Sequence, residues 1–134
     1  MANRFIRQDK GLGNYRKQYH FYFDSDGAAG DFVDKVLIDP VADLGLKSSA
    51  RLHIEKIQYN LSGCSARVEF DSGLVDDKQI WVLTEGTDNC VDFLQWGSMI
   101  DESGVDGTGK IQMTTTGLSS AGDQGSLLIQ IKYG

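Results

Sequence analysis

Short runs of alternating apolar and polar residues recur along the chain, separated by clusters of glycine and aspartate. An alternation with period two places successive side chains on opposite faces, which is typical of a half-buried β-strand. The segments between the runs are rich in turn-forming residues. Eight strands are predicted, and they cover residues 18–24, 32–38, 50–61, 65–70, 78–84, 91–96, 110–116 and 125–133.

The longest predicted strand, residues 50–61, contains a break in its alternation. By strict count, Ile54 and Ile57 fall on opposite faces of this strand. One extra residue at Glu55 or Lys56 would bring both side chains to the same buried face. We therefore predict a β-bulge at this point.

Two other segments depart from simple alternation. Ile80 to Leu83 are apolar in succession, which predicts a strand buried on both faces or covered on one face by a neighbour. Pro40 cannot continue a hydrogen-bonded ladder, so residues 39–49 are predicted to be a loop with room for one helical turn.

This pattern predicts a nearly all-β protein with helix content below about 15%. A jelly-roll-like β-sandwich over residues 18–134 is the favoured architecture, and a barrel is the alternative. Residues 1–17 lack a clear period, and Gly11 and Gly13 interrupt them. We predict that they form an extended N-terminal arm outside the sandwich.

Charge divides the chain of 134 residues in the same place. The net charge is −6. Residues 1–17 hold five basic residues and one acidic residue, a net charge of +4, whereas residues 18–134 carry −10. The acidic body opposes binding to nucleic acid or an anionic membrane, and neither is an expected partner. The basic arm suits an acidic partner, such as the body of another copy or a different protein, or a phosphate.

The cysteine content and the lack of long apolar runs bear on the cellular compartment of the protein. Cys64 and Cys90 do not form a disulfide framework, and we expect free, mostly buried thiols. The first residues lack the apolar core of a signal peptide, and no apolar run approaches the length of about 18 residues that spans a membrane. We therefore expect the protein to be made and kept in the cytoplasm.

Candidate catalytic chemistry is sparse. The sequence has no Gly-x-Ser-x-Gly, no His-Glu-x-x-His, no phosphate-binding Gly-x-x-x-x-Gly-Lys-Ser/Thr and no Cys-x-x-Cys motif. His20 and His53 lie in the middle of predicted strands and are expected to face away from the main core. Nothing in the spacing supports a pair between Cys64 and His53. We predict no catalytic residues and no enzymatic activity.

The segment Asp24-x-Asp26-Gly27 is a candidate metal site, because it resembles the first residues of a calcium-binding loop. The full motif requires a ligand, a glycine and a glutamate at its fifth, sixth and twelfth positions. Those positions hold Ala28, Ala29 and Lys35, so a hairpin turn is the better interpretation. Solvated loops also explain the acidic residues at 71–77 and 101–106, and no metal or cofactor is expected.

Two tryptophans leave a second function open. Trp81 and Trp96 could form a platform that stacks against a sugar ring. Both lie within or at the end of apolar runs, so packing in the core is favoured.

The C-terminal part of the sequence carries a pattern shared with a known class. Trp96-Gly97 is followed by an acidic loop and then by GTGKIQMTTTGLSSAGDQGSLLIQIKYG at 107–134. HIEKIQYNLSG at 53–63 and VEFD at 68–71 precede it. This arrangement resembles small cement or decoration proteins of tailed bacteriophages. The resemblance covers roughly residues 50–134, and its motifs are turn glycines and strand alternations.

The resemblance implies a non-enzymatic virion protein that binds the outside of a bacteriophage capsid. Such a protein would contact the major capsid protein, bridge neighbouring capsid subunits and stabilise the assembled shell by mass action. It also implies a homo-oligomer, with a trimer favoured, and a location on the capsid surface.

In this interpretation the N-terminal arm is the main attachment element. Its partner-binding residues are Arg4, Phe5, Ile6, Arg7, Lys10, Arg16 and Lys17. Two other classes remain open: a carbohydrate- or receptor-binding module of a phage tail or fibre, and an inner virion or tail-assembly component.

Overall fold

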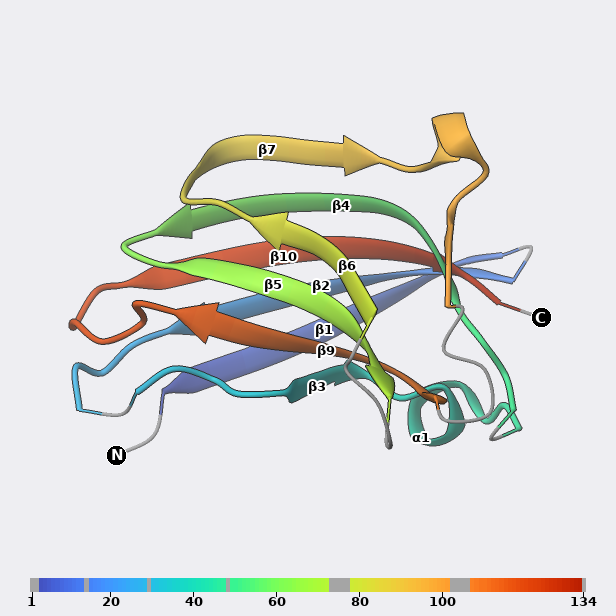
Figure 1. Cartoon of the computed structure of the whole chain (residues 1–134), viewed down its shortest axis with the longest axis horizontal. Coiled ribbons are helices and arrows are strands. Elements are labelled where there is room, and N and C mark those ends of the chain that lie inside the picture. The colour runs from blue at the N-terminus through green and yellow to red at the C-terminus, as the bar shows by residue number, and fades with distance from the viewer. Residues whose placement is uncertain are drawn as a thin grey trace.

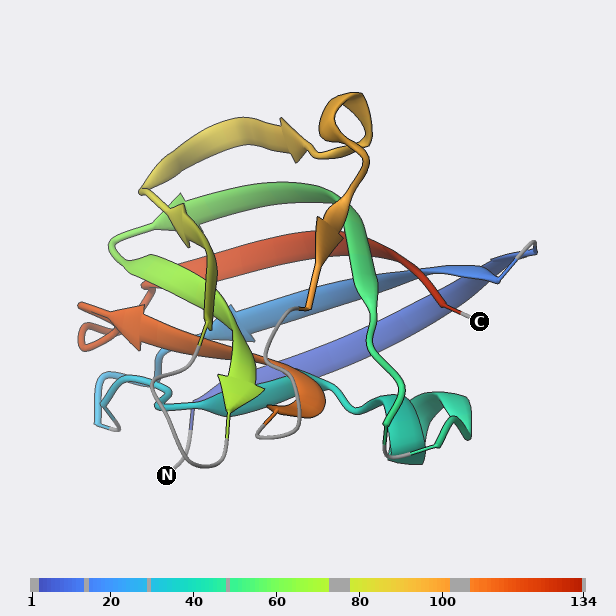
Figure 2. The same ribbon diagram turned by 45° about the vertical axis from the view of Figure 1, so that its right-hand side comes forward.

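Almost all regular structure in the protein is β. The computed structural model describes residues 3–13, 15–28, 30–47, 49–72, 78–101 and 107–133. Strands account for 63% and helices for 6% of the structure. The strands form two antiparallel sheets that face each other (Figure 1), and turning the molecule by 45° shows the same two layers (Figure 2). The prediction of a nearly all-β protein is confirmed, and the two sheets are compatible with a β-sandwich.

The larger sheet has the order β1-β2-β10-β4-β7. These strands are β1 (Arg4–Gly13), β2 (Arg16–Asp24), β10 (Gln124–Lys132), β4 (His53–Ser62) and β7 (Gly86–Asp92), and the two-residue β8 (Met99–Ile100) also pairs with β4. Alternate side chains of the central strands point to the core. Tyr19, Phe21 and Phe23 of β2 are fully buried, as are Leu127, Ile129 and Ile131 of β10.

The smaller sheet has the order β3-β9-β5-β6. Its strands are β3 (Lys35–Ile38), β9 (Gly107–Thr116), β5 (Ser65–Ser72) and β6 (Lys78–Leu83). Ala66, Val68 and Phe70 of β5 face the larger sheet and are buried, as their alternation predicts. The outward-facing Glu69 is only 8% exposed, because it lies between two neighbouring strands and pairs with Arg67.

The predicted bulge in β4 is confirmed. Opposite β10, Lys56 pairs with Gln130 and Ile54 pairs with Ile131, which leaves Glu55 as the extra residue. The bulge restores the phase of the strand, so Ile54 and Ile57 are both fully buried.

The prediction that β6 is buried on both faces, or covered on one face by a neighbour, is wrong in part. Ile80 and Leu83 are buried, but Trp81 is 39% exposed and Val82 is 46% exposed. β6 lies at the edge of its sheet, so no further strand of the described structure covers these side chains. A register shift leaves Ile80 as the extra residue opposite β5, which explains why two apolar residues separated by an odd number of positions both reach the core.

The expected helical turn lies between residues 39 and 49, as the single-turn helix α1 (Pro40–Leu44). Asp39 caps its first N–H groups, and Gly45 ends it in the left-handed conformation at φ 66°. The strand predicted at 91–96 is instead β7, which ends at Asp92, followed by a 3-10 turn, η1 (Leu94–Trp96). The Asp92 carboxylate accepts a hydrogen bond from the Leu94 N–H, which favours the turn over a continued ladder.

The N-terminal segment differs from its expectation as a separate arm. It is extended, but Arg4–Gly13 forms β1 and pairs with β2 along its length. The apolar alternation is hidden in the sequence because Arg7 and Asp9 follow Phe5 on the inner side of the strand. At the edge of the sheet these charged side chains reach partners on other elements.

Candidate functional site

The residues predicted to bind a partner all lie on the β1–β2 hairpin, on its two opposite sides. Phe5 and Arg7 are opposite the buried Phe23 and Phe21, so they face the smaller sheet. Arg4, Ile6 and Lys10 alternate with them and face outward. The structure therefore brings the predicted residues together along one hairpin but does not place them on one surface.

The outward-facing arginines of the hairpin bind carboxylates of the same chain. Arg4 Nη2 lies 2.6 Å from Asp24 Oδ2, and the Arg4 guanidinium stacks over the Tyr22 ring at 5.3 Å. Arg16 Nε donates hydrogen bonds of 3.0 and 3.3 Å to the two carboxylate oxygens of Glu55.

The inward-facing cations of the hairpin are paired as well. Arg7 donates to both oxygens of Asp43 at 2.7 and 3.0 Å and to the backbone oxygen of Leu37 at 3.2 Å. Burial would raise the pKa of Asp43, but hydrogen bonds from Arg7 and from the Asp39 N–H outweigh it and lower the pKa. Lys17 Nζ lies 3.0 Å from Asp9 Oδ2. Four of the five basic residues thus use their charge within the fold.

Phe5 packs between the two sheets where β1 meets β3, and its ring is therefore not presented to a partner. Its ring centroid lies 5.9 Å from that of Phe21 and 5.7 Å from that of Phe32, the latter edge-on. Lys35 Nζ lies 4.8 Å above the Phe5 ring. These contacts join β1 of one sheet to β3 of the other.

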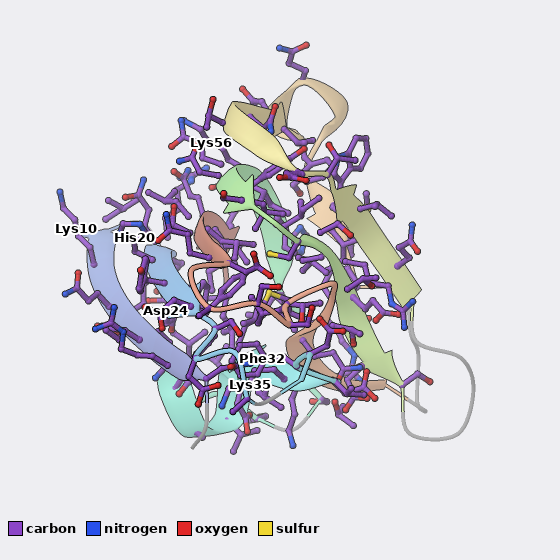
Figure 3. The ribbon with its side chains drawn as sticks, turned by 90° about the vertical axis from the view of Figure 1, so that its left-hand side faces the viewer. Lys10, His20, Asp24, Phe32, Lys35 and Lys56 are labelled. Atoms are coloured by element: carbon purple, nitrogen blue, oxygen red, sulfur yellow. The ribbon has the colours of Figure 1, made fainter. Side chains whose placement is uncertain are left out.

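What the hairpin offers to a partner is its outer side. Ile6 is 42% exposed and Leu12 is 39% exposed. Lys10 is exposed and forms no ion pair within the part of the chain that the structure describes. Figure 3 shows Lys10 on the side of the larger sheet that faces away from the smaller sheet.

The two histidines lie outside the core, as predicted. His20 is exposed on the outer side of β2, and the half-buried His53 has its Nδ1 3.2 Å from Ser98 Oγ. Cys64 and Cys90 are both free, but only Cys64 is buried. Burial raises the pKa of Cys64 to about 11, which keeps this thiol protonated at neutral pH.

The calcium-like sequence forms a turn. Asp24 is paired with Arg4, and Asp26 Oδ1 accepts a hydrogen bond of 2.8 Å from the Ala28 N–H. Within the described residues, no group of three His, Cys, Asp or Glu side chains is placed to hold a metal ion. The acidic residues at 73–77 and 102–106 lie outside the described part of the chain. No helix in the described ranges is long and apolar enough to cross a membrane.

The prediction that the tryptophans pack in the core is wrong for Trp81. Its ring stacks edge-on against Phe93, with ring centroids 5.6 Å apart, and keeps one side open to solvent. The side chain of Trp96 lies outside the described part of the structure.

Surface hollows were not anticipated from the sequence, and two of them bear on function. One, of about 200 Å³, has Leu61 and Gly125 in its lining together with amide and hydroxyl side chains, which include Tyr22, Asn60, Gln124 and Ser126. The other, of about 560 Å³, is lined by Lys47, Arg51, His53 and Lys132. Their residues come from distant parts of the chain, so no local motif marks them. The outward-facing amides on alternate positions of β4 and β10 were the one available signal.

Comparison of the chain with protein-family models, with curated proteins and with solved structures finds no match.

Proposed function

We propose that this chain is a non-enzymatic structural protein of a virion. It binds the outside of a bacteriophage capsid, contacts the major capsid protein and stabilises the shell by bridging neighbouring subunits. It acts as a homo-oligomer, with a trimer favoured, at the capsid surface. The resemblance of residues 50–134 to cement proteins suggests this role, and the strand pairing described next is the observation that carries it.

We infer further that the two sheets form a jelly roll. Apart from β1 and the short β8, the described strands are nested: β2 pairs with β10, β3 with β9, β4 with β7 and β5 with β6. Within this set of eight strands, the first (β2) therefore pairs with the last (β10), and each inner pair lies within the one before it. An antiparallel ribbon nested in this way wraps into two facing four-stranded sheets. Jelly rolls recur in viral capsid proteins and in lectins, which supports both candidate functions.

The attachment surface in this proposal is the outer side of the β1–β2 hairpin. Ile6 and Leu12 provide apolar contact area there, and Lys10 provides a charge that the described part of the chain leaves unneutralised. Arg4 and Arg16 contribute through the exposed parts of their side chains, whereas Lys17 faces inward and is paired with Asp9. Phe5 and Arg7 position the strand from behind.

The test of the proposed role is the number of copies in purified particles. Quantitative mass spectrometry compares this protein with the major capsid protein. We expect hundreds of copies, in a simple ratio to the capsid subunit. A few copies per particle would place the protein at the tail or a vertex, and complete absence from particles would refute the proposal.

The attachment surface has its own test. An Ile6→Ser, Lys10→Glu double variant should weaken binding to shells that lack this protein by at least about tenfold, because it removes apolar contact area and reverses the free charge. Val82→Ser, a similarly exposed position on the other side of the sandwich, is the matched control. Co-sedimentation with shells measures both. Equal binding by the two variants would exclude the hairpin as the attachment surface.

A carbohydrate- or receptor-binding module of a phage tail or fibre is the second candidate. The hollow between Tyr22, Asn60, Gln124 and Ser126 favours it, because amides and hydroxyls bind sugar hydroxyls. A glycan array with the wild-type protein and with Asn60→Ala and Gln124→Ala variants tests this function. Retention of a glycan by the wild type alone would support it, and the absence of any retained glycan would count against it.

A further inference from the structure

The hollow of about 560 Å³ lies at the end of the molecule where β4 begins and β10 ends. Figure 1 and Figure 2 both place the end of β10 and the segment between α1 and β4 at this end of the sandwich. Its polar lining residues come from the loop after α1, from the first residue of β4 and from the end of β10. They are Lys47, Ser49, Arg51, His53, Lys132 and Tyr133.

The charge of this hollow is of one sign. Lys47, Arg51 and Lys132 line it, and no carboxylate is among its described lining residues. Lys47 and Lys132 form no ion pair with the residues that the structure describes, in contrast to the paired cations of the β1–β2 hairpin. In a chain of net charge −6, two lysines without an ion-pair partner among the described residues create a local attraction for anions.

Arg51 gives the hollow a fixed wall. Its Nη1 donates to the Ala50 backbone oxygen at 2.9 Å, and its Nη2 donates to the Gly107 backbone oxygen at 2.7 Å. Its Nε lies 3.8 Å from the buried carboxylate of Asp101. Arg51 is therefore held in place, whereas the two lysines remain available to a ligand.

We propose that this hollow is a binding site for an oxyanion, either a carboxylate or a phosphate group. Lys47 and Lys132 form charge-assisted hydrogen bonds with it. Arg51 supplies a fixed wall whose charge is partly offset by Asp101, and the Ser49 and Tyr133 hydroxyls supply further donors. The volume falls within the usual range of small-molecule sites, roughly 300–1,000 Å³, so a ligand with more than one anionic group fits. This site goes beyond the capsid role proposed above and does not depend on it.

The experiment titrates the full chain with pyrophosphate and with citrate at low ionic strength, by calorimetry and by ¹H–¹⁵N NMR. We expect saturable binding of both anions, with chemical-shift changes centred on residues 46–53 and 132–133. A Lys47→Gln, Lys132→Gln double variant should lose at least about tenfold in affinity. A Lys56→Gln, Lys110→Gln double variant removes the same charge from residues that do not line the hollow and should bind as the wild type does. Thermal unfolding verifies that all variants are folded.

Each outcome decides the proposal. A short peptide of aspartate and glutamate is titrated in parallel, to learn the source of the oxyanion. Binding of citrate and the peptide without pyrophosphate assigns the site to carboxylates, and binding of pyrophosphate alone assigns it to phosphates. No saturable binding of any of the three overturns the proposal, and so does equal weakening by the two double variants. Because the assay contains only this chain, its result is independent of the copy number in particles.

Discussion

At the scale of single residues, Glu55 shows how a buried carboxylate is retained on the outer side of the larger sheet. It is 2% exposed and accepts hydrogen bonds from Arg16 and from Gln130 Nε2, the latter at 3.1 Å. Gln18 donates to Gln130 at 3.1 Å and extends the network to β2. Burial would raise the pKa of Glu55, but the hydrogen bonds from Gln130 and Arg16 outweigh it and lower the pKa below 4.5. Through Glu55, the bulge residue of β4, these hydrogen bonds therefore join β4 to β10 and β2.

This network predicts a specific pH dependence. A carboxylate whose pKa is lower in the folded state stabilises the fold above its unfolded pKa, and the effect is lost as the pH falls through the folded pKa. Glu55→Gln should lower the free energy of unfolding at pH 7 by about 1–3 kcal/mol. The difference from the wild type should shrink as the pH falls from just above 4.5. Urea unfolding at a series of pH values measures it.

Asp9→Asn is the control for this prediction, because the Asp9 side chain is 50% exposed and an exposed ion pair contributes little. A Glu55→Gln variant with the stability and pH dependence of the wild type would contradict the proposed role of the network.

Gly125 supports a second prediction at the residue scale. It lies on the inner side of β10, where a Cβ atom would overlap with the Phe23 ring and with Leu61. Gly125→Ala should therefore destabilise the fold by about 1–3 kcal/mol through overpacking. Gly11 is the matched site, because a Cβ atom added there would meet no described atom within 4 Å, and Gly11→Ala should be nearly neutral. Urea unfolding compares them. The prediction fails if both substitutions have the same effect.

At the scale of elements, β1 links the fold to the proposed attachment surface. Removing residues 1–17 would expose the edge of β2 and take Phe5 away from Phe21 and Phe32. We expect this truncation to destabilise the protein, and Phe5→Ala alone to lower the free energy of unfolding by about 1–3 kcal/mol. Chemical denaturation measures both. A truncated protein as stable as the full chain would show that this segment behaves as a separate arm.

The strands also show which parts of the fold could be predicted from the sequence and which could not. Period-two alternation located β4, β5, β9 and β10, because each has one apolar face, and the phase slip at Glu55 located the bulge. β1 was missed as a strand because its inner positions include Arg7 and Asp9, whose partners lie on other elements. The pairing of the hairpin cations and the basic hollow depend on contacts between distant residues, which no local pattern reports.

At the scale of the whole molecule, different contacts hold the β1–β3 edge and the β6–β7 edge of the sandwich together. This difference predicts which strands open first and exchange their amide hydrogens fastest. Phe32 stacks against both Phe5 and Phe23 between β1 and β3, with Lys35 over the rings, whereas Trp81 and Phe93 meet between β6 and the end of β7. β10 and β9 are paired on both sides, but among the described strands β6 pairs only with β5. Hydrogen exchange should therefore be slowest in β10 and β9, faster in the bonded amides of β1, and fastest in β6. NMR exchange measurements resolve these strands, and protection in β6 equal to that in β10 would show that the sandwich opens only as a unit.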